Sequence, residues 1–233
     1  MSQERTEAVV LRGVDFSETS RIVTLLTPAR GRMACMAAGA RRTKSPLSAV
    51  LDTFNRVEIV YYWKESRSVQ KLGETTLLDG YSGVKRDLKK SAYAAFPLEL
   101  AYKVAQENEP SQALYSTLVT GLEGMAAWGD DPRTHAAWQV FHLLRVAGYA
   151  PVVECVGSPT GFSYAYGVTN RPADRRLGQA ECRALRAMAE SRDVCPRIEN
   201  AGEVFGLLKG FAARHVETEF RSLYVIEQLF AET

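Results

Sequence analysis

The chain has 233 residues, 46% of them hydrophobic and 24% charged, which is typical of a globular protein with a sizeable core. The net charge is only +2, which excludes a uniformly basic coat, so any polyanion site must come from local clustering. No run of 18 apolar residues occurs, which excludes a helical membrane span, and the start MSQERTEAVV is too polar for a signal peptide. We therefore expect a cytoplasmic protein without membrane contact.

The first 80 residues alternate between β-favourable runs and turn formers. Five strands are predicted, over residues 6–12, 21–27, 32–38, 57–64 and 68–76. A short helix is expected at 45–51, because Ser45 can act as its N-cap and Pro46 suits its first position. Five strands with a short helix between the third and fourth follow the order of a five-stranded oligonucleotide-binding (OB) barrel.

Beyond residues 80–83 the hydrophobic period changes from 2 to about 3.6, and we place a domain boundary there. Residues 1–80 are expected to form the barrel and residues 84–233 a helical domain, which makes the fold class α+β. Helices are predicted over 86–107 with a bend or restart at Pro97, 111–128, 134–147, 179–191, and 202–230 with a break near His215. Residues 151–179, rich in Gly, Pro, Ser and Tyr, are expected to be an irregular insert without zinc.

A cluster of positive charge lies between Arg30 and Lys44, at the predicted third strand and the loop after it. It has five basic residues and no acidic one, namely Arg30, Arg32, Arg41, Arg42 and Lys44. Lys and Arg supply charge to a nucleic-acid backbone, and the Gly, Thr and Ser among them let main-chain N–H groups approach phosphate. We predict that these five contact DNA, with Arg21 as a sixth candidate. The alternative is a solvated surface loop, which most short basic clusters are.

The aromatic run Tyr61-Tyr62-Trp63 lies in the predicted fourth strand. Tyr61 and Trp63 share a face with Val57 and Ile59, so at least Tyr61 is expected in the core. Tyr62 points the other way and is a candidate for stacking on a base, which is typically worth about 1–3 kcal/mol. Core or rim packing is the alternative for each ring.

No catalytic constellation is evident. His135 and His142 share a helical face, but neither has a carboxylate or cysteine at metal-ligand spacing. Asp130 and Asp131 precede a proline and suit a turn or a cap. GxSxG, Walker and GxGxxG motifs are absent, so we expect no enzyme. A hydrolase or transferase using His142 and Cys155 is the alternative.

The four cysteines stand at wide, irregular spacings: Cys35, Cys155, Cys182 and Cys195. They form neither a disulfide framework nor a CxxC pair, which fits a reducing compartment. Cys155 begins what looks like half of a zinc knuckle, with Ser158 where a second ligand would stand. One thiolate cannot make a tetrahedral site, so we expect no metal and no other cofactor.

Four segments carry a resemblance to a known family: 7–42, 45–59, 98–118 and 141–155. They include GARR-x-x-S before the short helix and AGYAP-x-x-x-C further on, which are specific in combination. On these segments the chain resembles the RecO family of bacterial recombination mediator and DNA repair proteins. The resemblance implies an OB barrel and a helical domain. It also implies binding to single- and double-stranded DNA and annealing of complementary strands.

The resemblance further implies partners. With RecR, such a protein helps load recombinase onto DNA coated by single-stranded-DNA-binding protein (SSB), whose acidic C-terminal tail the helical domain receives. Arg133 and Arg145 are our candidates for binding that tail. Arg145 lies four residues after Phe141 on an apolar face, where snorkelling or a salt bridge within the chain is the alternative.

Two points limit the resemblance or compete with it. Some family members carry a four-cysteine zinc site after the GY motif, but only Cys155 matches it in this chain. A rival interpretation is a protein-binding helical adaptor whose barrel is only structural.

Overall fold

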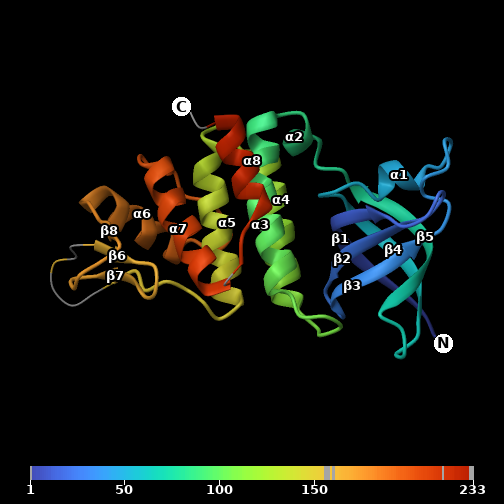
Figure 1. Cartoon of the computed structure of the whole chain (residues 1–233). Coiled ribbons are helices and arrows are strands. Elements are labelled where there is room, and N and C mark those ends of the chain that lie inside the picture. The colour runs from blue at the N-terminus through green and yellow to red at the C-terminus, as the bar shows by residue number, and fades with distance from the viewer. Residues whose placement is uncertain (1, 155–157, 159–160, 217, 231–233) are drawn as a thin grey trace. The chain divides into compact units, whose positions relative to one another are not determined.

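The computed structural model describes residues 2–154, 158, 161–216 and 218–230 (Figure 1). The chain forms two compact units. The first contains residues 1–82 together with 105–119, and the second contains 83–104 together with 120–233. Residues 105–119, which the sequence analysis assigned to the helical domain, therefore group with the N-terminal residues.

The first unit contains a closed barrel of five strands. They are β1 (Ser2–Asp15), β2 (Arg21–Thr27), β3 (Gly31–Ala37), β4 (Arg56–Trp63) and β5 (Val69–Asp79). Their order is β1-β2-β3-β5-β4, and β4 pairs with β1 to close the ring. Only β3 and β5 run parallel; the other neighbours are antiparallel. With helix α1 (Leu47–Val50) between β3 and β4, this confirms the predicted OB-type barrel.

Alternation along the strands fills the barrel interior. In β3 every second residue is buried, from Gly31 to Ala37. The interior cluster includes Val23, Leu25, Met33, Cys35, Val57, Ile59, Tyr61 and Leu72. Fully burying one large apolar side chain stabilises a fold by about 1.5–3 kcal/mol, so this period-2 pattern fixes which face of each strand points inward.

Residues 105–119 pack against the start of β3. The Arg32 N–H donates to the Gln106 carbonyl at 3.0 Å. Gly31 has φ +54°, and a Cβ atom at that position would lie 2.2 Å from the Glu109 carbonyl oxygen. Glycine is therefore required here both for the left-handed backbone and for the close approach.

Seven further helices follow the barrel strands among the described residues. They are α2 (Ser82–Lys85), α3 (Leu88–Val104), α4 (Gln112–Ala127), α5 (Pro132–Val146), α6 (Gln179–Glu190), α7 (Ala201–Val216) and α8 (Arg221–Phe230). Helix α3 continues through Pro97, where we expected a bend or restart. The expected break in the last helical stretch lies after Val216. No helix in the described ranges combines the length and apolarity of a membrane span.

Helix α5 is the centre of the second unit. All its residues from Thr134 to Leu144 are buried, and it packs between α3 and α7 (Figure 1). Its N-cap is Asp131, whose side chain accepts a hydrogen bond from the Arg133 N–H. The expected turn or capping role of Asp131 is thus confirmed.

The insert contains a small antiparallel sheet instead of only irregular chain. Its strands are β6 (Gly161–Ser163), β7 (Gly167–Thr169) and β8 (Arg175–Arg176), in the order β7-β6-β8. Phe162 and Val168 pair across β6 and β7 and are both buried. Strands of two or three residues are too short to show a period in the sequence, which is why the sheet was missed. Cys155 lies outside the described residues.

Candidate nucleic-acid interface

Two loops of the barrel are joined at one of its ends. Ala37 at the end of β3 pairs with Arg21 at the start of β2. The loop at residues 16–20, which precedes Arg21, and the loop at residues 38–46, which follows Ala37, therefore lie at the same end of the barrel. The Arg41 N–H donates to the Thr19 carbonyl at 3.0 Å, and the Arg41 guanidinium donates to the Ser17 carbonyl. We call residues 16–20 and 38–46 the loop pair.

The loop pair and its flanking strand ends hold four of the six basic residues that we predicted to contact DNA: Arg21, Arg41, Arg42 and Lys44. Asp15 accepts from Arg21 at 3.3 Å and from Arg41 at 3.1 Å, so one carboxylate serves two guanidinium groups. Glu18 is the other acidic residue here, which leaves a net charge of +2. Arg42 and Lys44 are exposed and form no ion pair with any residue that the structure describes. The end of the barrel is therefore cationic.

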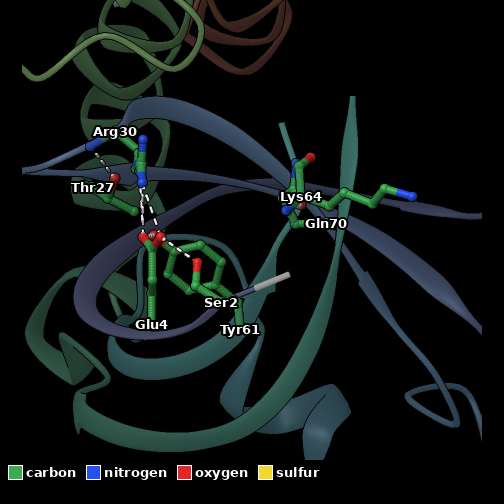
Figure 2. A network of polar contacts seen from close by, with 7 residues as sticks. All are labelled: Ser2, Glu4, Thr27, Arg30, Tyr61, Lys64 and Gln70. Atoms are coloured by element: carbon green, nitrogen blue, oxygen red, sulfur yellow. Dashed lines mark hydrogen bonds and ion pairs between the residues drawn. The ribbon is translucent and has the colours of Figure 1, made fainter. Parts of the chain in front are cut away.

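Arg30 instead joins a network around Glu4 (Figure 2). Its guanidinium donates to Glu4 at 2.9 Å and lies 4.2 Å from the centre of the Trp63 ring. The Tyr61 hydroxyl donates to the same carboxylate at 2.6 Å. Burial alone would raise the pKa of Glu4, but the hydrogen bonds from Tyr61 and Arg30 outweigh it and leave that pKa lowered. Burial, with the bond to Glu4, raises the pKa of Tyr61 to about 12.

Arg32 is also paired within the first unit. Its guanidinium lies 3.1 Å from the Glu107 carboxylate. Arg32 is five residues before Ala37 on an extended strand, so roughly 17 Å of β3 separate it from the loop pair. The structure therefore does not bring Arg30 and Arg32 together with the other four. Their DNA contacts stay a prediction, and we leave both out of the proposed surface.

A row of side chains crosses the outer face of the barrel, one residue along the strands from the ends that flank the loop pair. Strand pairing places its members side by side in the order Val14, Ile22, Met36, Lys71 and Tyr62. All five are exposed or half-buried, and we call them the outer row. The Lys71 ammonium lies 5.5 Å from the centre of the Tyr62 ring. The neighbouring Tyr61 is 1% exposed and belongs to the core, as predicted.

The loop between β4 and β5 and the start of β5 add cations that the sequence analysis missed. Gln70 is 1% exposed and holds this loop: its side chain accepts from the Lys64 N–H at 2.8 Å (Figure 2). It also donates to the Arg67 carbonyl at 2.7 Å. Lys64, Arg67 and Lys71 are exposed and have no ion-pair partner within the described ranges. They were missed because they lie apart in the sequence from the cluster at 30–44. A loop between the fourth and fifth strands of an OB barrel was the signal that could have found them.

In the second unit, Arg133 and Arg145 lie at opposite ends of α5. Twelve residues of helix put about 18 Å between them, so the structure does not form one clamp from both. The Arg133 guanidinium pairs with Asp131 at 2.7 Å and lines a cavity of about 320 Å³ with Lys89, Tyr93 and Phe230. Asp131 also lines this cavity, so the position combines two cations and one carboxylate with two aromatic rings.

Arg145 has a different environment. It donates to the Ala189 carbonyl at 2.8 Å and lies 5.3 Å from the centre of the Phe141 ring. Burial, followed by the charge of Arg192, lowers the pKa of Arg145. None of the carboxylates in the described part of the chain forms an ion pair with it. Of the two candidates, only Arg145 keeps an uncompensated charge.

The histidines of α5 are core residues. The His135 ring is 1% exposed and lies between Trp128 and Trp138, at 5.4 and 5.3 Å between ring centres. Burial, with the nearby charge of Lys90, lowers the pKa of His135 to about 4, so the ring is neutral at pH 7. Within the described residues no group of three His, Cys, Asp or Glu side chains could hold a metal ion.

Comparison with known proteins identifies the family. The model "Recombination protein O N terminal" matches residues 1–81, and "Recombination protein O C terminal" matches residues 85–223. The chain belongs to the RecO family. The DNA repair protein RecO of Exiguobacterium sibiricum is 36% identical over 170 residues, which are 70% of this chain and 67% of that protein. That of Salinibacter ruber is 32% identical over 202 residues, 84% of this chain and 76% of that protein.

A third relative extends the similarity to the whole chain. The DNA repair protein RecO of Myxococcus xanthus is 28% identical over 243 aligned positions, 98% of this chain and 99% of that protein. Membership in the RecO family gives this chain a role in DNA repair and recombination. The family is one of recombination mediators, in agreement with the resemblance found in the sequence.

Proposed function

We propose that this RecO family member binds single- and double-stranded DNA through the cationic end of its barrel and anneals complementary strands. The proposal is based on the loop pair of an OB-type barrel, where Arg42 and Lys44 are exposed and pair with none of the carboxylates that the structure describes. We further propose that it acts in the cytoplasm with RecR to help load recombinase onto SSB-coated DNA.

The proposed annealing mechanism is electrostatic. Two DNA strands repel each other through their phosphates, and a cationic surface that binds both lowers this repulsion. No bond is made or broken, so the mechanism needs positions for phosphate but no catalytic group. The loop pair offers such positions on backbone that hydrogen bonds hold in place.

Charge reversal of the loop pair tests this proposal. We expect the double variant Arg42→Glu/Lys44→Glu to anneal complementary oligonucleotides at least tenfold more slowly than the wild type, because it replaces two phosphate-binding cations by anions. Binding should weaken about equally for all sequences, since backbone contacts carry no sequence information. A strand-annealing assay with fluorescent oligonucleotides, with and without SSB, measures both effects.

The matched control reverses two exposed arginines of the second unit, Arg86→Glu/Arg214→Glu. It changes the net charge by the same amount and leaves the loop pair intact, so annealing should stay within about twofold of the wild type if the loop pair is the site. Equal loss in both double variants would show that only net charge matters. That result would contradict a site at the loop pair.

We also propose that the second unit binds the acidic C-terminal tail of SSB. An acidic peptide with a hydrophobic end needs a cation beside an apolar groove. The cavity at Arg133 offers this combination through Lys89, Tyr93 and Phe230, while Arg145 offers the uncompensated charge.

A fluorescent tail peptide separates the two positions. Arg133→Glu should weaken peptide binding if the cavity is the site, and Arg145→Glu should weaken it if the C-terminal end of α5 is the site. If one variant binds the peptide as tightly as the wild type, the substituted residue is not part of the peptide site. Unchanged binding by both variants would exclude both candidates.

The helical-adaptor alternative keeps the peptide site but gives the barrel no DNA contact. Retention of the wild-type protein on a DNA column at low salt distinguishes the two functions. The local net charge of +2 at the loop pair favours DNA binding, because a polyanion site needs such a local excess of positive charge.

A further inference from the structure

Phe16 is an aromatic residue that the barrel leaves in solvent. It is the first residue of the loop pair, and its side chain is 61% exposed. Its backbone is fixed, since the Phe16 N–H donates to the Ser20 carbonyl at 3.1 Å. The ring is therefore presented by a hydrogen-bonded turn and contributes little to the core.

The surroundings of Phe16 are those of a polyanion site. Asp15, the residue before it, holds the guanidinium groups of Arg21 and Arg41. Ser17, the residue after it, accepts from Arg41. The loop that carries Arg41 also carries the exposed Arg42. An exposed ring thus stands within one residue of the contacts that organise the cations.

The outer row ends close to Phe16 in the chain. Val14 ends that row at 47% exposure, two residues before Phe16 on the same chain. At the other end of the row lies Tyr62, beside Lys71. The outer face therefore carries an aromatic ring at each side with apolar and cationic side chains between them, a pattern that suits stacked bases and phosphates of a single strand.

We propose that Phe16 stacks on an unpaired base and thereby favours single-stranded over double-stranded DNA. The inference rests on the proposed DNA binding and adds a residue and a selectivity to it. In a duplex both faces of each base are covered by neighbouring bases, so the ring meets no free face. Phosphates are available in both forms of DNA, and Arg42 and Lys44 therefore bind both.

Two substitutions test the ring itself. Phe16→Ala should weaken binding to a single-stranded oligonucleotide by about 5- to 150-fold, the range expected for one stacked base at about 1–3 kcal/mol. It should leave binding to a duplex of the same length within twofold. Phe16→Trp should restore single-strand binding, and its added indole fluorescence should be quenched by the single strand but not by the duplex. Fluorescence anisotropy at fixed salt measures the affinities.

The matched control removes charge in place of the ring. Arg42→Ala/Lys44→Ala should weaken single- and double-stranded binding together and reduce the salt dependence, whereas Phe16→Ala should leave the salt dependence unchanged. Phe16→Leu, which keeps apolar area without a ring, should behave like Phe16→Ala. Because the side chain is exposed, these variants are expected to fold.

Three outcomes would overturn the inference. They are unchanged single-strand affinity in Phe16→Ala, equal loss for both forms of DNA, or full activity in Phe16→Leu. If the wild type binds neither form of DNA, the proposed function fails and this inference with it. Suppose instead that the Phe16 variants bind DNA as tightly as the wild type, whereas Arg42→Ala/Lys44→Ala binds it more weakly. The proposed function then stands, and the stacking residue is elsewhere.

Discussion

Glu4 is a hydrogen-bond acceptor shared by three side chains of the barrel. It accepts hydrogen bonds from Arg30, Tyr61 and Ser2, which lie on three different segments of the chain (Figure 2). The network connects β1 to the turn before β3 and to β4. Arg30 looks like a DNA contact in the sequence because Glu4 is 26 residues away and nothing local indicates the pairing.

We predict that Glu4→Gln destabilises the protein by about 1–2 kcal/mol in urea unfolding, because it weakens charge-assisted hydrogen bonds from two partly buried groups. The pKa of Glu4 is lowered, so its contribution is present above its ordinary pKa near 4.5 and is lost as the pH falls below that value. The difference between the variant and the wild type should therefore shrink at acid pH.

The control is Glu58→Gln, which breaks the ion pair of Glu58 with Arg5 on the same two strands. Arg5 is 63% exposed, and an exposed pair of this kind contributes about 0.2–1 kcal/mol. If Glu4→Gln lowers the free energy of unfolding no more than Glu58→Gln does, the hydrogen bonds around Glu4 do not stabilise the barrel beyond an exposed ion pair.

At the scale of elements, the loops of the barrel are held by hydrogen bonds, two of the three through contacts that are distant in the sequence. The loop at 38–46 is tied to Thr19 and Ser17, and the loop between β4 and β5 is tied to the buried Gln70. Residues 105–119 hold the start of β3 through Gln106. The loop at 38–46 and the start of β3 are therefore positioned by segments distant in the chain, whereas the loop between β4 and β5 is positioned by a residue of the strand that follows it.

Gly31→Ala tests the contact between β3 and residues 105–119. The new Cβ would lie 2.2 Å from the Glu109 carbonyl and 2.8 Å from that of Gln106, on a left-handed backbone. We expect a loss of about 3 kcal/mol or more in urea unfolding, from backbone strain and steric displacement together.

Gly39→Ala is the matched control for that experiment. Gly39 also has a left-handed φ of +75°, but the nearest atom to a new Cβ would be the Arg42 Cδ at 3.6 Å. It should cost only the conformational part, about 1 kcal/mol. Equal losses in the two variants would show that the close approach at Gly31 has no energetic weight.

At the scale of the whole molecule, the chain is nearly neutral and its positive charge is local. The net charge is +2 over 233 residues, and the four cations around the loop pair face only Asp15 and Glu18. The exposed Lys64 and Arg67 of the loop between β4 and β5, together with Lys71 at the start of β5, form a second group of cations on the same barrel. A strand that crosses both groups binds more phosphates than one that stays at the loop pair.

The salt dependence of binding shows whether the DNA strand contacts only the loop pair or both groups of cations. Four phosphate contacts on a single strand give a slope of log K against log salt of about −2.8, and seven contacts give about −4.9. An anisotropy titration between 50 and 200 mM salt, a range of about fourfold, resolves the difference. A slope near zero would contradict any phosphate contact.

Much of the architecture follows from local patterns in the sequence. Alternation around Met33 and Cys35 marks β3, and turn formers mark its ends, because a strand must place every second residue in the core. The change of period after residue 80 marks the start of the helices. The family is also readable from the sequence, through segments that include the loop at Arg41 and Arg42.

The candidate site was only partly readable. Local charge identified Arg41, Arg42 and Lys44, but it also selected Arg30 and Arg32, which pair with Glu4 and Glu107. It overlooked Lys71 and Phe16, because a single cation or ring carries no signal until pairing shows which surface it shares.

The sequence by itself determined the elements, their order and the family, since these depend on residues close together in the chain. The tertiary structure decided which charges remain free, because closing the barrel brings carboxylates to some arginines and leaves others in solvent. It also decided which outward side chains form one surface, because strand register alone places Val14, Met36 and Tyr62 in one row.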